Sequence, residues 1–140
     1  MTEIRAHAEA LRAHVGARGA PETREIERGA LRKFAVATGD PHAAHHGAVA
    51  APTYVAALRS PLPPLPEPDE PFRSHLHTND ELELHAPIRA GDVVETTCEL
   101  TDVFVKEGRS GPMLFTQVTF TTTRDGEPVI TVAWTEVQYG

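Results

Sequence analysis

Apolar residues recur at helical spacing in the first part of the chain. Thr2 is a residue type that caps helices, and four apolar residues after it lie in a stripe on one face of the predicted helix: Ile4, Ala8, Leu11 and Val15. Gly16 is expected to end this helix. A short extended piece at residues 24–27 precedes a second stripe, which ends at Gly39 before Pro41: Leu31, Phe34, Ala35 and Thr38. The two patterns predict two helices that pack by their apolar faces.

A third helical segment differs from these two because residues 52–58 are apolar almost all round. Pro52 suits a first helical turn, so the segment predicts a short buried helix. Six of the twelve prolines fall within residues 61–71. Because proline fixes φ and cannot continue a helix, this stretch is expected to form an extended loop.

The second half of the chain alternates apolar and polar residues with a period of two. The alternating positions are Leu82 and Leu84; Val94, Thr96, Cys98 and Leu100; Val103 and Val105; Leu114, Thr116, Val118 and Phe120; Ile130, Val132 and Trp134. They predict antiparallel strands, with a tight hairpin turn at Asp125-Gly126 and a looser loop at residues 107–111.

Helices followed by about four long strands predict an α+β layout, a single domain over residues 1–140 with its sheet packed round one buried helix. Such a sheet leaves an edge and a face uncovered, so we also expect a dimer.

Charge and composition narrow the possible partners. The formal net charge is −7, and the thirteen Lys and Arg residues are scattered, which argues against nucleic acid. A single cysteine, Cys98, sits in an alternating apolar run and is expected to be a buried thiol. Neither a membrane span nor a signal peptide is visible in the sequence, so we expect a cytoplasmic protein.

Asp40 and His45 are the candidate catalytic pair. Five positions apart on a continuous helix, they would point about 140° away from each other. Gly39 and Pro41 break the helix, so a loop can bring both side chains into one cleft. The pair suits elimination of water from a 3-hydroxyacyl thioester, with His45 as the base and Asp40 holding the hydroxyl or the water. How the proton is shared stays open.

Three segments of the chain resemble a known family. Phe34-x3-Thr38-Gly39-Asp40-x4-His45 is similar to the hydratase motif of MaoC-like enoyl-CoA hydratases, whose aspartate and histidine form the catalytic dyad. Residues 49–55, Val-Ala-Ala-Pro-Thr-Tyr-Val, resemble the start of the central helix in the N-terminal dehydratase subfamily. His77 and residues 81–92, which end in Pro-Ile-Arg-Ala-Gly-Asp, resemble its following strand and turn.

The resemblance, which runs from about Leu11 to Val137, implies a hot-dog fold: a curved antiparallel sheet wrapped around a central helix. It implies an (R)-specific hydratase or dehydratase of fatty acid or polyketide metabolism, acting on a 2-enoyl or 3-hydroxyacyl thioester of CoA or acyl carrier protein. No cofactor is expected, since CoA or phosphopantetheine enters as part of the substrate. The expected assembly is a homodimer, or a heterodimer with a second hot-dog subunit.

The central helix is expected to bind the substrate, through Ala51, Pro52, Thr53, Tyr54 and Leu58. Catalytic members of the family have a glycine at the position of Pro52, whose N–H polarises the thioester carbonyl. Proline has no N–H, so Thr53 or Tyr54 would have to donate instead. We expect the acyl chain to pass between this helix, near Tyr54 and Leu58, and the sheet of a neighbouring subunit.

The sequence bears on two alternative functions and on a possible metal site. Pro52 and the short segment between His45 and the helix favour a non-catalytic acyl-binding subunit that pairs with a catalytic one. Thioester hydrolysis on this fold usually takes an acidic residue from the central helix, and residues 53–58 contain none. The five histidines at positions 42, 45, 46, 75 and 77 lack a thiolate or a fixed ligand spacing, so no metal site is expected.

Overall fold

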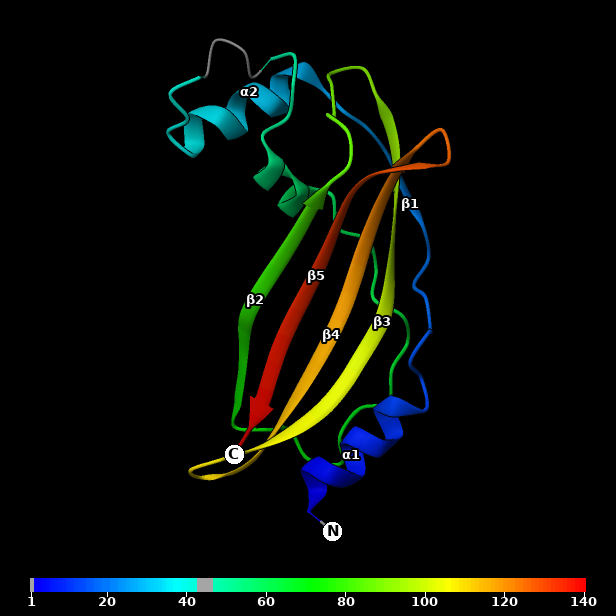
Figure 1. Cartoon of the computed structure of the whole chain (residues 1–140), viewed down its shortest axis with the longest axis vertical. Coiled ribbons are helices and arrows are strands. Elements are labelled where there is room, and N and C mark those ends of the chain that lie inside the picture. Colours follow the sequence, from blue (N-terminus) through cyan, green and yellow to red (C-terminus); the bar gives the residue numbers. More distant parts are fainter. Residues whose placement is uncertain (1, 43–46) are drawn as a thin grey trace.

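A single curved antiparallel sheet forms the body of the molecule (Figure 1). The computed structural model describes residues 2–42 and 47–140. The strands are β1 (Glu22–Glu25), β2 (Ser74–Leu84), β3 (Val93–Gly108), β4 (Gly111–Arg124) and β5 (Glu127–Tyr139). They lie in the order β1-β3-β4-β5-β2, and every neighbouring pair is antiparallel. The predicted α+β class and antiparallel sheet are confirmed.

The residues at every second position of the predicted alternation form the buried side of β3. Val94, Thr96, Cys98 and Leu100 are all buried, and the Thr96 hydroxyl makes a hydrogen bond of 2.9 Å with that of Thr122 on β4. Burial raises the pKa of the Cys98 thiol to about 11, so the thiol stays protonated at neutral pH, as expected for a core cysteine.

Both predicted turns are present, although one is tighter than expected. Asp125 and Gly126 have φ values of 53° and 80°, the left-handed conformation of a two-residue hairpin turn. The β3–β4 connection was expected to span residues 107–111. Strand pairing instead continues to Gly108 and Gly111, so only Arg109 and Ser110 form the loop.

Helix α1 (Glu3–Arg12) lies against one end of the sheet (Figure 1). The Thr2 hydroxyl accepts a hydrogen bond from the Arg5 N–H at 3.4 Å, which confirms the predicted cap. The predicted stripe is corrected at Val15, which is 47% exposed. The helix stops at Arg12 because the chain then turns toward β3, where the Gly16 N–H donates to the Leu100 carbonyl at 2.8 Å.

Two helical segments sit at the opposite end of the sheet (Figure 1). Helix α2 (Arg28–Ala37) buries Leu31 and Ala35 of the predicted stripe, and Phe34 is half-buried. Thr38, predicted on the same stripe, is exposed because it caps the end of the helix. The segment expected to be a short buried helix is a single 3₁₀ helix, η2 (Pro52–Ala57), in which only Tyr54 is buried. Within the described residues, no helix is long and apolar enough to span a membrane.

The prolines explain why η2 is so short. Pro61, Pro63 and Pro64 follow it closely, and proline cannot continue a helix. The chain therefore leaves η2 as the predicted extended loop and runs along the sheet toward α1 (Figure 1). The 3₁₀ helix η2 lies over one end of the sheet face, and the loop passes over β4 and β5 further along.

Strand β2 forms one edge of the sheet, and its apolar residues are more exposed than the alternation predicted. Leu82 and Leu84 are 39% and 51% exposed. Both pair with buried residues of β5, Val132 and Ile130, so they face the side that carries η2. The short helix does not fully cover either leucine, so the unpaired β2 edge offers two exposed apolar side chains to a second subunit.

We expect a two-fold dimer that buries the β2 edge. Light scattering should give twice the 15.2 kDa mass of the chain at micromolar concentration. Leu84→Glu should shift the protein toward monomer by placing a charge in the interface. Val36→Glu is the matched control, because Val36 is an exposed apolar residue that belongs to α2 and not to the β2 edge. A monomeric wild type, or a dimer that Leu84→Glu leaves intact, would contradict the expectation.

Candidate active site

The end of α2 fixes the backbone at Asp40. Gly39 has a φ of 66°, in the left-handed region that glycine adopts without strain. Its N–H donates to the Val36 carbonyl at 3.2 Å, and the Asp40 N–H donates to the Ala35 carbonyl at 3.0 Å. These two bonds form a Schellman motif, so Asp40 leaves the helix in a defined direction.

The Asp40 carboxylate is held by the turn that follows. Its Oδ1 accepts a hydrogen bond from the His42 N–H at 2.8 Å, the geometry of an aspartate-initiated turn. The side chain is half-buried. His45, the second member of the predicted dyad, lies outside the described residues. The pairing of Asp40 with His45 therefore stays a prediction.

Aromatic packing places α2 over η2. The rings of Phe34 and Tyr54 meet edge to face, with centroids 5.4 Å apart. Leu31, Tyr54 and Leu58 belong to one buried cluster, which also includes Cys98 of β3. The helix that carries Asp40 is thus anchored on the segment expected to bind substrate.

The Gly-Asp turn before β3 positions the chain that leads into η2. The Ala50 N–H donates to the Ile88 carbonyl at 2.8 Å, and the Ala90 N–H donates to the Ala48 carbonyl at 3.0 Å. These bonds tie residues 48–50 to the turn that the family resemblance singled out. The start of η2 is therefore fixed by a segment more than thirty residues further along the chain.

Asp92 stabilises this turn. Its Oδ2 accepts hydrogen bonds from the Arg89 N–H at 2.7 Å and from Arg124 Nη1 at 2.6 Å. Burial acts to raise the pKa of Asp92, but these hydrogen bonds and the two arginine charges outweigh it and lower the pKa. The aspartate of the Gly-Asp motif has a structural role here, linking the turn to β4.

The predicted substrate-binding residues divide into two groups. Ala51 is half-buried, and Pro52 and Thr53 are exposed at the start of η2. Tyr54 and Leu58 are only 9% and 2% exposed and belong to the core. Of the five residues, only Thr53 lines the small cavity of about 150 Å³ beside η2.

Residues that the sequence did not single out complete this cavity. Val55 and Ala56 come from η2, Asp80 and Leu82 from β2, Phe120 from β4, Val132 from β5, and Arg59 follows η2. The guanidinium carbon of Arg59 lies 3.4 Å from the centroid of the Trp134 ring, a cation–π contact. Burial lowers the pKa of Arg59, and the nearby Asp80 and Glu136 carboxylates act in the opposite direction.

The two candidate donors for a thioester carbonyl differ in availability. The Tyr54 N–H already donates to the Ala51 carbonyl at 2.9 Å, within the 3₁₀ turn. The Thr53 N–H makes no such bond to the described part of the chain, and Thr53 is exposed at the cavity. Thr53 is therefore the better placed of the two. Across residues 2–42 and 47–140, no group of three or more His, Cys, Asp or Glu side chains could hold a metal ion.

Comparison with known proteins agrees with this architecture. A family model described as "FAS1-like, dehydratase domain region" matches residues 13–132. No curated protein matches the chain. The chain belongs to this dehydratase-domain family, whose MaoC-like members share the hot-dog fold.

Solved structures share the fold. The ChsH1-ChsH2 complex from Mycobacterium tuberculosis has a TM-score of 0.72 and 17% identity, covering 98% of this chain and 91% of that chain. A MaoC-like dehydratase has a TM-score of 0.71 and 26% identity, covering 93% and 43%. The HadBC complex from Mycobacterium tuberculosis, a 3R-hydroxyacyl-ACP dehydratase, has a TM-score of 0.65 and 20% identity, covering 89% and 96%.

The Schellman motif predicts a specific sensitivity at Gly39. Gly39→Ala should destabilise the protein by about 1 kcal/mol, because alanine is strained at a φ of 66°. Gly29→Ala is the matched control: Gly29 lies in α2, and within the described residues neither glycine has a neighbouring atom within 4 Å of an added Cβ. This control should be neutral or slightly stabilising. Urea unfolding measures both, and equal effects of the two substitutions would contradict the assignment.

Proposed function

We propose that this chain is an (R)-specific hydratase or dehydratase that adds water to a 2-enoyl thioester, or removes it from a 3-hydroxyacyl thioester, of CoA or acyl carrier protein. The observation that carries the proposal is the position of Asp40. In a chain of a dehydratase family, this carboxylate is fixed by a helix-ending motif and a tight turn, a few residues before His45.

The chemistry requires one proton to leave C2 and one proton to reach the oxygen on C3. In dehydration, His45 takes the proton from C2, the C3–O bond breaks, and the departing hydroxyl receives a proton from the dyad and leaves as water. Asp40 holds that hydroxyl, and the proton reaches it from the His45 imidazolium directly or by way of Asp40. Hydration runs the same steps in reverse: water adds at C3, one of its protons passes to the dyad, and the dyad returns a proton to C2. The dyad takes one proton and gives one, so its own protonation is unchanged after each turnover.

The negative charge that develops on the thioester carbonyl oxygen must be stabilised by a hydrogen-bond donor. In this proposal the donor is the Thr53 N–H, since Pro52 has none and the Tyr54 N–H is engaged within η2. Thr53 stands at the mouth of the cavity beside η2, where a thioester would enter. The acyl chain would then run along Arg59 and Phe120, over the face of the sheet.

An acyl-binding subunit without chemistry of its own is the second candidate. The short η2 and its Pro52 favour this function, because they leave the sheet face open and remove one donor. The ChsH1-ChsH2 and HadBC structures are complexes of two named components. By analogy, this chain would hold the acyl group while a second hot-dog subunit carries out the reaction.

The dyad is tested by turnover. His45→Ala and Asp40→Asn should each lower the hydration rate of enoyl-CoA substrates by about 10²- to 10⁴-fold, the usual effect of removing one general acid or base. His42→Ala is the matched control, because His42 contacts Asp40 through its backbone N–H, which alanine keeps. This variant should remain within a few-fold of the wild type.

The assay also separates the two candidate functions when it includes short, medium and aromatic acyl thioesters and candidate hot-dog partners. Activity that depends on Asp40 and His45 supports catalysis by this chain. Activity that appears only with a partner and survives the loss of both residues places the chemistry in the partner. Hydration no faster than that of the double variant, with or without a partner, refutes the catalytic proposal.

A further inference from the structure

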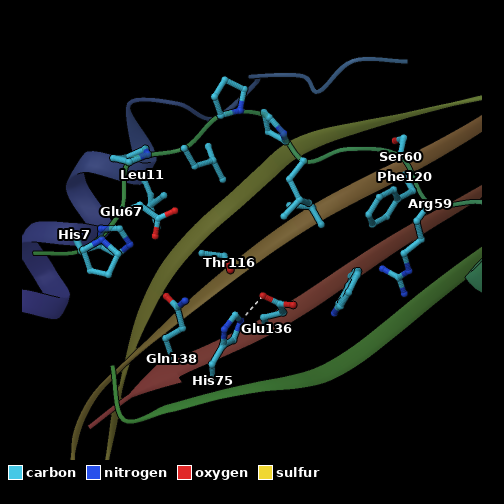
Figure 2. A pocket seen from close by; sticks show the side chains of 18 residues that line it. His7, Leu11, Arg59, Ser60, Glu67, His75, Thr116, Phe120, Glu136 and Gln138 are labelled. Atoms are coloured by element: carbon cyan, nitrogen blue, oxygen red, sulfur yellow. Dashed lines mark hydrogen bonds and ion pairs between the residues drawn. The ribbon is translucent and has the colours of Figure 1, made fainter. Parts of the chain in front are cut away.

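A second, larger cavity lies beneath the proline-rich loop (Figure 2). Its volume is about 570 Å³, in the range of small-molecule sites. The loop after η2 forms its roof, and β4 and β5 form its floor (Figure 2). Apolar side chains supply much of the lining: Leu11, Leu62, Leu65, Val118, Phe120 and Trp134. The ligand that fits this cavity is therefore largely apolar.

The roof of the cavity is fastened to the rest of the molecule. Arg24 Nη1 donates to the Arg59 carbonyl at 2.6 Å, where the loop begins. Gly19 packs directly against the loop, since a Cβ added there would lie 1.9 Å from the Pro61 carbonyl oxygen. At the far end, the Glu70 N–H donates to a carboxylate of α1 at 2.9 Å. These contacts hold the loop off the sheet and keep the cavity open.

Four buried polar atoms are left without a hydrogen-bond partner among the described residues, and the residues that carry them all line this cavity. They are Arg59 Nη1, Ser60 Oγ, Trp134 Nε1 and Gln138 Oε1. Ser60 is only 8% exposed. Buried polar groups in folded proteins are nearly always hydrogen-bonded to protein or to water, so four unpaired ones on residues that line one cavity leave hydrogen-bonding capacity there for a water or for a polar atom of a ligand.

The charges around the cavity select against a carboxylate. Glu67 and Glu136 line it together with Arg59. Burial lowers the pKa of His7, outweighing the nearby carboxylates, so this residue adds no positive charge at neutral pH. The Glu136 carboxylate already makes a hydrogen bond of 2.5 Å with Nε2 of His75. A neutral oxygen, which meets the unpaired donors without adding negative charge, fits better than an anion.

Arg59 also connects this cavity with the candidate active site. Arg59 and Phe120 line both the cavity beside η2 and the larger one. The two cavities adjoin at Arg59, so an acyl chain that enters at Thr53 would have to pass the guanidinium to reach the larger one. Figure 2 shows Arg59 and Ser60 at one end of that cavity and Gln138 at the other, so residues with unpaired polar atoms stand at both ends.

We propose that the larger cavity binds the distal part of the acyl group, and that this part is an apolar tail carrying a neutral oxygen group: a hydroxyl or a carbonyl where it accepts from Arg59, or a hydroxyl where it donates to Gln138 Oε1 at the far end. Arg59 and Gln138 are then specificity-determining residues. The inference rests on the proposed function for the identity of the acyl substrate, but the binding site it describes does not require that the chain be catalytic.

Binding of substrate analogues that cannot react tests this inference directly. The probes are the saturated N-acetylcysteamine thioesters of decanoic, 10-hydroxydecanoic and decanedioic acid, the last bearing one free carboxylate. Trp134 is the only tryptophan of the chain and lies in the cavity, so its fluorescence reports binding there. The hydroxylated probe should bind about tenfold more tightly than the unsubstituted one, the value of a buried hydrogen bond, and also more tightly than the carboxylated one.

Variants assign the preference to the cavity. The double variant Arg59→Met, Gln138→Leu should bring the two neutral probes within about twofold of each other, with calorimetry confirming the fluorescence. The matched control is Arg109→Met, an exposed residue of the β3–β4 loop, which should keep the preference. Circular dichroism verifies that each variant folds.

Equal binding of the hydroxylated and unsubstituted probes to the wild type overturns the inference, as does a preference for the carboxylated probe or one that survives the double variant. Because the probes are saturated, this outcome is independent of hydratase activity. A chain that prefers the hydroxylated probe but hydrates nothing would refute the catalytic proposal and leave the inference standing.

Discussion

The covering of one sheet face is the constraint on which the rest of this structure depends. The inner face of β3, β4 and β5 is apolar and must be shielded from water. In this chain the helix that begins the cover, η2, is only six residues long, because prolines follow it and cannot extend it. The cover continues as an extended loop, which is held by hydrogen bonds to β1 and α1 and cannot pack as closely as a helix.

Several functional features follow from this incomplete cover. The loop stands away from β4 and β5, which leaves the cavity with its unpaired polar atoms. Leu82 and Leu84 stay 39% and 51% exposed on β2 because the short η2 does not fully cover them. Arg59, the second residue after η2, turns inward and stacks on Trp134 between the two cavities. A helix long enough to fill this face would have occupied the space that we assign to the acyl tail.

The candidate dyad is positioned by separate, mainly local interactions. Gly39 ends α2 in the left-handed conformation, and the turn after it holds the Asp40 carboxylate. The contact between Phe34 and Tyr54 ties α2 to η2, and the Gly-Asp turn around Asp92 fixes the chain that enters η2. Asp40 can thus keep its place whether or not the rest of the face is covered, which is why catalytic and acyl-binding functions are both compatible with this frame.

The features predicted well from the sequence are those governed by local chemistry. The alternation from Val94 to Leu100, the turn at Asp125-Gly126 and the helix end at Gly39 each depend on neighbouring residues, and the structure has them where expected. The prediction was wrong at Val15 because the helix ends at Arg12. The chain then turns so that the Gly16 N–H donates to the carbonyl of Leu100, a residue far along the chain.

The two cavities could not be predicted from the sequence either. The larger cavity arises where residues 59–68 cross β4 and β5, and the smaller one lies between η2 and β2; no residue spacing in the sequence encodes either long-range arrangement. Arg59 follows a helix and reads as an ordinary surface arginine, while its partner Trp134 lies seventy-five positions later. Tyr54 and Leu58 looked suited to line a pocket, yet both are needed in the core.

The stereochemistry of hydration tests the central claim most directly. The chain, alone and with candidate hot-dog partners, is incubated in D₂O with a trans-2-enoyl-CoA, and the product is analysed by chiral chromatography and NMR. The account predicts the (R)-3-hydroxyacyl thioester with one deuterium at C2, added on the same face as the hydroxyl. An (S) product, or no product above that of the Asp40→Asn, His45→Ala double variant, would contradict it.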